Sequence, residues 1–216
     1  MTTSGPGLPR TVRRSAALML VGFAVGAGLA VWLSRPATPN DESAEVGFAR
    51  DMATHHAQAV EMSLLIRDTA SDAVLRTLAY DIIVTQSTQR GVFMGWLQAW
   101  DVAQTSTRPR MAWMRSHAHA EPTAGGGGSL MHGMATDEEM RRLRDARGAE
   151  AEILFLQLMI RHHEGGVVMA RALEGLSRRV DVLDMARSID STQRAEITEM
   201  KKMLEQRSAR PLPSIL

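Results

Sequence analysis

The sequence predicts an all-α protein in which two duplicated helical hairpins form a four-helix bundle, preceded by one N-terminal transmembrane helix. Apolar residues recur at helical spacing over long stretches, and no stretch shows the alternation typical of strands. A Phe, Met, His-His, Val, Met pattern occurs twice at a constant offset of 107 residues, as from Phe48 to Phe155. One hairpin cannot cover its own apolar face, so the two copies are expected to pair.

The N-terminal region predicts export. Three arginines in the N-terminal residues 1–15 precede an uncharged run of 18 residues, 16–33, which as a helix of about 27 Å can just cross a bilayer core. The arginines favour a cytoplasmic N-terminus, with the chain beyond a polar tether over 34–43 outside. A cleaved signal peptide is the alternative, but no small-x-small cleavage site directly follows the run. We therefore expect a single-pass signal anchor in the cell membrane and an extracytoplasmic C-terminal domain.

The first helical hairpin is predicted over residues 44–103. Ser43 or Asp41 can cap its first helix, and Ser71 can cap its second helix, which runs to about Trp100. The second helix keeps its apolar residues three or four positions apart, as an amphipathic helix does.

The pattern stops over residues 104–135, which hold two prolines and a run of four glycines and are predicted to form a flexible linker. This segment also contains several soft metal donors, namely Met111, Met114, His117, His119, Met131, His132 and Met134. In a flexible polar segment such residues have no core to fill, so loose copper capture is one interpretation. Unselected linker composition is the other.

The second hairpin, with a short preceding helix, is predicted over residues 136–206. A Thr-x-x-Glu capping box at Thr136 begins the short helix. A long apolar helix with the second His pair follows, and Gly175 is placed to end it. Ser177 can cap the last helix, which leaves a tail over residues 207–216.

The repeated pattern provides the candidate metal ligands. At about 100° per residue, its Met and His side chains share one helix face roughly 120° wide, with a small residue, Ala59 or Gly166, at the centre. Thioether and imidazole groups suit Cu(I), and imidazole also accepts Cu(II) or zinc. The predicted ligands are Met52, His55, His56, Met62, Met159, His162, His163 and Met169.

A structural interpretation of the same residues stays open. An inward-facing His can be a hydrogen-bonded core residue, and Met at helical spacing can serve packing alone. Gln86 and Gln193, on the partner helices, could orient an imidazole through its second nitrogen or could equally belong to a buried polar network.

Composition and missing motifs exclude several classes of function. The formal net charge is +1 and only 4% of residues are aromatic, so nucleic-acid binding is not expected. The chain contains no Cys, which excludes disulfides and thiolate metal sites. It also lacks the Glu-x-x-His di-iron pattern, the zinc-protease pattern and a phosphate loop, so no catalytic residue is predicted.

The duplicated Met-x-x-His-His core resembles the family known as domain of unknown function 305, over about residues 44–206. The second copy also has the Gln193-x-x-Glu196-Ile197-x-x-Met200 pattern of that family. In the first copy Gln89-Arg90 and Phe93 depart from it. The resemblance implies an exported, ferritin-like helical bundle. Some members are associated with copper, which implies the eight repeated Met and His residues as copper ligands.

These observations together predict a membrane-anchored extracytoplasmic protein that binds or buffers copper. Its expected partners are the metal ion and, through the N-terminal helix, the membrane. The alternatives are a helical bundle for structural or protein interactions without metal, and a metal-dependent redox enzyme of unknown substrate.

Overall fold

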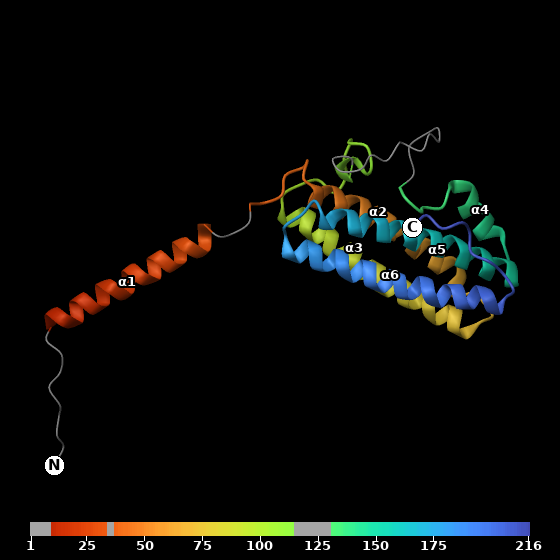
Figure 1. Ribbon diagram of the computed structural model, residues 1–216, viewed down its shortest axis with the longest axis horizontal. Helices are drawn as coiled ribbons and strands as arrows, with labels where there is room; N and C mark the ends of the chain where they lie inside the picture. The colour runs from red at the N-terminus through yellow and green to blue at the C-terminus, as the bar shows by residue number, and fades with distance from the viewer. Residues whose placement is uncertain (1–9, 34–36, 115–130) are drawn as a thin grey trace, which may run out of the picture. The chain divides into compact units, whose positions relative to one another are not determined.

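The computed structural model describes residues 10–33, 37–114 and 131–216, and the chain divides into two compact units, Met1–Thr38 and Pro39–Leu216. The first unit contains helix α1, Arg10–Leu33 (Figure 1). Among the described residues, no helix combines the length and apolarity that crossing a membrane requires.

The second unit is built from four long helices that lie side by side (Figure 1). They are α2 (Ala44–Arg67), α3 (Ala73–Ala99), α5 (Gly148–Glu174) and α6 (Val180–Gln206), accompanied by the 3₁₀ turn η1 (Ala112–Met114) and the short helix α4 (Asp137–Asp145). Helices α2 and α3 form one hairpin, α5 and α6 form the other, and the hairpins meet through α2 and α5. The described residues include no strand, which confirms the predicted all-α class.

Two of the predicted helix starts are confirmed. Ser43 is the N-cap of α2, where its hydroxyl accepts a hydrogen bond from the Val46 amide at 3.3 Å. Thr136 begins α4 with a complete capping box, because its hydroxyl accepts from the Glu139 amide while the Glu139 carboxylate accepts from the Thr136 amide. Both devices satisfy amides that have no partner within the helix.

Two other predicted caps are wrong. Asp72, not Ser71, caps α3, because the amide and hydroxyl of Ser71 donate instead to the buried carboxylate of Glu152 at 2.8 and 2.9 Å. The last helix begins after Arg179 without a side-chain cap. Ser177 donates instead to Glu45 of the other hairpin, at 2.6 Å. In each case the serine hydroxyl, expected to cap the helix, donates to a carboxylate that is distant along the chain.

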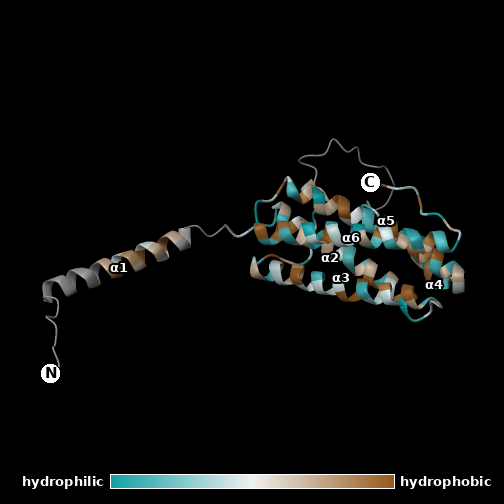
Figure 2. Cartoon of the chain, turned by 60° about the horizontal axis from the view of Figure 1, so that its bottom comes forward, coloured by the Kyte–Doolittle hydropathy of each residue, from teal (hydrophilic) through white to brown (hydrophobic). Residues whose placement is uncertain are grey.

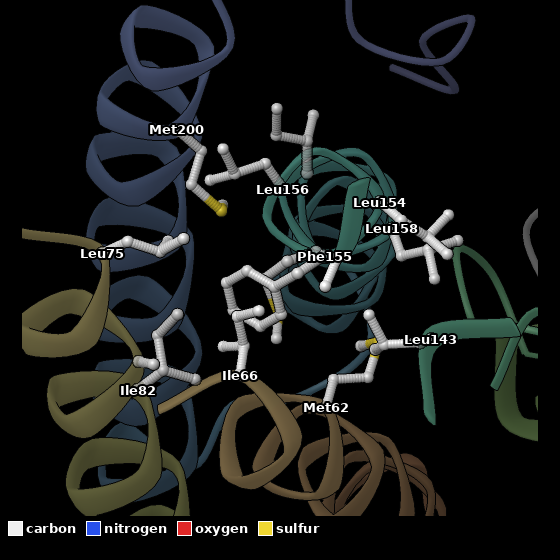
Figure 3. Packing of buried hydrophobic residues seen from close by; sticks show 14 of the residues in the cluster. Met62, Ile66, Leu75, Ile82, Leu143, Leu154, Phe155, Leu156, Leu158 and Met200 are labelled. Atoms are coloured by element: carbon white, nitrogen blue, oxygen red, sulfur yellow. The ribbon is translucent and has the colours of Figure 1, made fainter. Parts of the chain in front are cut away.

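The hydrophobic core consists of two clusters at opposite ends of the bundle. The Phe48 cluster combines the first half of α2 with the second half of α3, the second half of α5 and the first half of α6. The Phe155 cluster combines the complementary halves of the same four helices (Figure 3). Hydrophobic and hydrophilic residues alternate along each long helix, as amphipathic helices require (Figure 2).

The described parts of the segment 104–135 pack on the bundle. One carboxylate oxygen of Asp51 accepts from the Met111 amide at 2.8 Å and from the Trp113 indole at 2.9 Å. Trp113 also lies so close to Gly47 that a Cβ there would be 2.5 Å from the indole. Met131 is buried in the Phe48 cluster. The predicted linker donors His117 and His119 lie outside the described residues.

Candidate metal centre

A layer of polar residues separates the two hydrophobic clusters in the middle of the bundle. It consists of His55, His56, Gln86, His162, His163 and Gln193, none of which is more than 2% exposed. The register of the helices explains the layer. On α3, for example, Gln86 lies between Ile82 of the Phe155 cluster and Phe93 of the Phe48 cluster. A fully buried layer of this kind, costly to desolvate, calls for a specific explanation.

The crossing of α2 and α5 brings the first histidines of the two motifs together. The ring centroids of His55 and His162 are 3.7 Å apart, with the planes inclined by 33°. Within each helix, the ring of the second histidine is farther away, with centroids 6.5 Å apart in α2 and 6.3 Å in α5. Of the four predicted histidines, the first of each copy therefore form a central pair, and His56 and His163 flank it.

The four predicted methionines are also buried, and they divide between the two ends of the bundle. Met52 and Met169 belong to the Phe48 cluster, whereas Met62 and Met159 belong to the Phe155 cluster. Each pair combines the methionine that precedes the histidines in one copy with the methionine that follows them in the other copy. This is the arrangement that two antiparallel copies of one motif produce.

The second histidine of each copy has the same hydrogen-bonding arrangement. Nε2–H of His56 donates to Oε1 of Gln89 at 2.8 Å, and Nε2–H of His163 donates to Oε2 of Glu196 at 2.6 Å. Each acceptor lies 33 residues after its histidine, on the partner helix of the hairpin. The duplicated sequence therefore folds into a duplicated contact, with an amide in one copy and a carboxylate in the other.

His55 has a different partner, the backbone carbonyl of His132, which accepts from Nε2–H at 3.2 Å. A carbonyl oxygen can only accept, so Nε2 of His55 carries the proton and Nδ1 has the free lone pair. The carboxylate of Glu196 imposes the same tautomer on His163. The amide oxygen of Gln89 does so for His56. A hydrogen bond that fixes one ring nitrogen in this way is typical of histidines whose other nitrogen binds a metal.

The Nδ1 atoms of all four histidines are buried without a hydrogen-bond partner, and so is Nε2 of His162. A buried polar group without a partner costs about 1–3 kcal/mol, so these five imidazole nitrogens alone would be a heavy penalty for a purely structural core. An unprotonated imidazole nitrogen that is buried without a partner is suited to accept a cation.

Burial keeps the imidazoles of His55, His56 and His162 uncharged. Desolvation, together with the smaller effect of the neighbouring His56, lowers the pKa of His55 from 6.5 to about 3. Desolvation also lowers the pKa of His56 to about 3. The pKa of His162 falls well below its ordinary value, mainly through burial and also through its proximity to His55. At neutral pH protons therefore do not compete with a metal for the lone pairs of these three rings.

The prediction that Gln86 and Gln193 orient the imidazoles is not supported. Both amide groups are buried without a hydrogen-bond partner. Gln193 lies instead against Gly166, where an added Cβ would be 2.1 Å from its Oε1. The residues that do orient imidazoles, Gln89 and Glu196, lie one helical turn further on. Their shared offset of 107 residues was the signal in the sequence that could have identified them.

Within the described ranges, no group of three or more His, Cys, Asp or Glu side chains is arranged to hold a metal ion. The four histidines therefore do not form a ready zinc-type site by themselves. A metal in this layer would need thioether ligands as well, and the four buried methionines on both sides of the histidines offer them.

The fold and the site define an antiparallel four-helix bundle with a duplicated set of buried Met and His residues in its interior. A family model, described as domain of unknown function (DUF305), matches residues 45–204. The chain belongs to this family.

Solved structures of the family are similar to this chain. A presumed secreted DUF305 protein from Streptomyces coelicolor is 42% identical, covers 81% of this chain and 99% of its own, and has a TM-score of 0.72. A DUF305 fragment from Deinococcus radiodurans is 32% identical over 80% of this chain and 99% of its own, with a TM-score of 0.63.

CopM in its Cu(I)-bound form is 25% identical, over 75% of this chain and 96% of its own, with a TM-score of 0.56. CopM is also known in Cu(II)-bound, silver-bound and apo forms. No curated protein matches this chain.

Proposed function

We propose that this protein is an exported copper-binding protein. It takes up the metal, foremost as Cu(I), between the histidines of the polar layer and the methionines on either side of it. The main support is the set of buried Nδ1 atoms without partners, because a bound ion would supply the interaction that they lack. The proposed ligands are the eight residues of the repeated motif, Met52, His55, His56, Met62, Met159, His162, His163 and Met169.

The donor set favours a soft metal. Thioether sulfur is a weak ligand for zinc or magnesium but a good one for Cu(I) and Ag(I). Cu(I) is a single positive charge, and its transfer into an uncharged interior is less costly than that of a divalent ion. CopM, with its Cu(I), Cu(II) and silver forms, supports the same choice of metals.

The antiparallel arrangement supports two equivalent donor groups. The first contains His56 with Met52 and Met169, because Phe93 of the Phe48 cluster lies 5.7 Å from the His56 ring. The second, related by the repeat, contains His163 with Met62 and Met159. The His55–His162 pair lies between the groups and is available to both.

Export is the proposed location, supported by the presumed secreted relative and by the N-terminal sequence. An uncleaved anchor over residues 16–33 is the finer proposal. Carbonate extraction of membranes tests it: an anchored chain stays in the pellet with an intact N-terminus, whereas a cleaved or unanchored chain is released.

Competitive titration of the full chain with Cu(I) and with Ag(I), against a chromogenic chelator, tests the proposed function. We expect the His55→Ala/His162→Ala variant to bind both ions at least about 10-fold more weakly. His132→Ala is the matched control, since that side chain is exposed and only its backbone carbonyl reaches the site. Equal affinity of all three proteins would leave the bundle with a purely structural role.

The methionines allow a separate test of the two donor groups. Met52→Leu/Met169→Leu keeps the apolar volume of the Phe48 cluster but removes two thioethers. We expect it to lose one class of Cu(I) site and to keep the other. Met203→Leu, a buried methionine outside the repeat, is the control and is expected to bind like the wild type. Loss of all binding, or of none, in the double variant would contradict two groups.

The Glu196 carboxylate makes the two groups unequal. A carboxylate that accepts from the Nε2–H of His163 increases the basicity of its Nδ1 more than the amide of Gln89 does for His56. We therefore expect Glu196→Gln to weaken only the tighter class of site and to make the two classes more alike. Glu199→Gln, an exposed change on the same helix, is expected to alter neither.

A further inference from the structure

The segment 131–135 lies over the His55 side of the polar layer. The carbonyl of His132 reaches the His55 ring, and Met131 beside it is buried in the Phe48 cluster. Ala135, at the other end of the segment, is also buried. A short non-helical segment thus closes one side of the junction between α2 and α5 and contributes a polar atom to it.

Two glycines permit this close approach. A Cβ on Gly165 of α5 would be 2.0 Å from the His132 carbonyl oxygen, so any larger residue would displace the segment. Gly133 has a φ of +76°, and a Cβ there would be 2.3 Å from the Arg161 carbonyl. The left-handed backbone and the contact both require glycine at this position.

On the opposite side, Gln58 of α2 holds the segment. Its Nε2 donates to the Ala135 carbonyl at 2.9 Å and its Oε1 accepts from the Ala135 amide at 2.8 Å. This side-chain amide therefore pairs with both backbone groups of one residue, as a neighbouring β-strand would. Arg161 of α5 adds an ion pair to Glu139, just beyond the segment.

Helices α2 and α5 have different residues at one pair of corresponding positions of the repeat. Gln58 and Gly165 occupy corresponding positions of the two copies, at the offset of 107 residues. One copy therefore has a side chain that binds the segment, and the other has a gap that admits it. For this reason His162, the first histidine of the second copy, has no counterpart to the contact between His55 and the His132 carbonyl.

We infer that Gln58 is a positioning residue which, through the segment 131–135, fixes the Nε2–H tautomer of His55 and leaves its Nδ1 lone pair free for a metal. The inference rests on the proposed function for the identity of the ligand but not for the tautomer. Both side-chain hydrogen bonds of Gln58 go to Ala135 and not to an imidazole. It holds the carbonyl that decides which nitrogen of His55 carries the proton.

The test reads the tautomer in the metal-free protein and the affinity for Ag(I) in the same samples. The full chain contains only seven histidines, so ¹⁵N-histidine labelling gives a spectrum in which the two ring nitrogens of His55 can be assigned by substitution. In the wild type we expect a protonated Nε2 and an unprotonated Nδ1 for His55. In Gln58→Met, which keeps the length of the side chain, we expect both tautomers and an Ag(I) affinity lower by about 10-fold.

Gly165→Ala is the second variant, since it displaces the His132 carbonyl from the other helix and is expected to give the same mixture of tautomers. Gln157→Ala is the matched control. That glutamine also donates to a non-helical backbone, at the Arg210 carbonyl, and its hydrogen bond is exposed, so neither measurement is expected to change.

Retention of a single Nε2–H tautomer of His55 in both variants would overturn the inference, and so would an Nδ1–H tautomer in the wild type. Failure of the wild type to bind Ag(I) or Cu(I) has a different meaning. It would refute the proposed function, while the tautomer measurement would still decide the role of Gln58.

Discussion

The buried histidines are expected to make the metal-free protein less stable as the pH falls from 7 to 5. In the unfolded chain, His55 and His56 take up protons around pH 6.5, whereas in the folded bundle desolvation lowers each pKa to about 3. Between these values the unfolded state binds more protons than the native state, so the free energy of unfolding decreases as the pH decreases. The loss begins below about pH 6.5 and levels off near pH 3.

The size of the effect follows from the same two values. At pH 5 an imidazole with an unfolded pKa of 6.5 and a native pKa of about 3 has lost roughly 2 kcal/mol of stabilisation relative to pH 7. His55 and His56 together therefore account for about 4 kcal/mol, and His162 contributes in the same direction. This is a large part of the stability of an ordinary domain.

Urea unfolding of the metal-free full chain at pH 7, 6 and 5, followed by circular dichroism, measures this dependence. In His56→Gln, the decrease in the free energy of unfolding that His55 and His56 together cause between pH 7 and pH 5 is expected to be about half as large. This expectation does not depend on the stability of the variant at pH 7. His132→Ala, with its exposed ring, keeps the wild-type dependence. Equal or greater stability at pH 5 than at pH 7 would show that the imidazoles are not buried in the uncharged form.

Substitutions away from the histidines test the packing and the ion pairs. Gly166→Ala is expected to cost about 1–3 kcal/mol in urea unfolding, since its Cβ would collide with Gln193, whereas Gly95→Ala, with nothing within 4 Å, gains up to about 1 kcal/mol. Arg207→Ala leaves the buried carboxylate of Glu152 without its charged partner and is expected to lower the free energy of unfolding by about 3 kcal/mol. Arg141→Ala, at an exposed pair, is expected to leave the free energy of unfolding nearly unchanged, because solvent screens that pair. Equal effects within either pair of variants would contradict the burial on which these values depend.

The local sequence was a good guide to the helices and a poor one to their ends. Periodic apolar residues predicted the four long helices because burial of one face dominates the energetics of a helix in a bundle. The caps at Ser71 and Ser177 failed for a common reason. Each hydroxyl donates to a carboxylate from a distant part of the chain, Glu152 or Glu45, and such a charge-assisted hydrogen bond is strong enough to set the position of the serine.

The candidate site was predicted in its donors but not in its supporting contacts. The Met and His positions follow from a repeat that is visible in the sequence, and all eight are buried. The oxygen atoms that select the tautomers come from α3, α6 and the segment 131–135, which lie far away along the chain. No spacing rule connects His55 to the carbonyl of a residue 77 positions later.

The sequence by itself determined the helical class, the duplication and the chemical nature of the inner face, because periodicity and residue type are local properties. Only the tertiary structure decided which residues of the two copies of the motif lie together. Antiparallel packing of α2 on α5 stacks His55 on His162 and pairs the first methionine of each copy with the second of the other. The physical reason is that two equivalent faces in a two-fold arrangement bring like residues together at the centre and opposite ends together on either side. It also decided where that symmetry breaks, since the segment 131–135 is bound by Gln58 of one copy and admitted by Gly165 of the other.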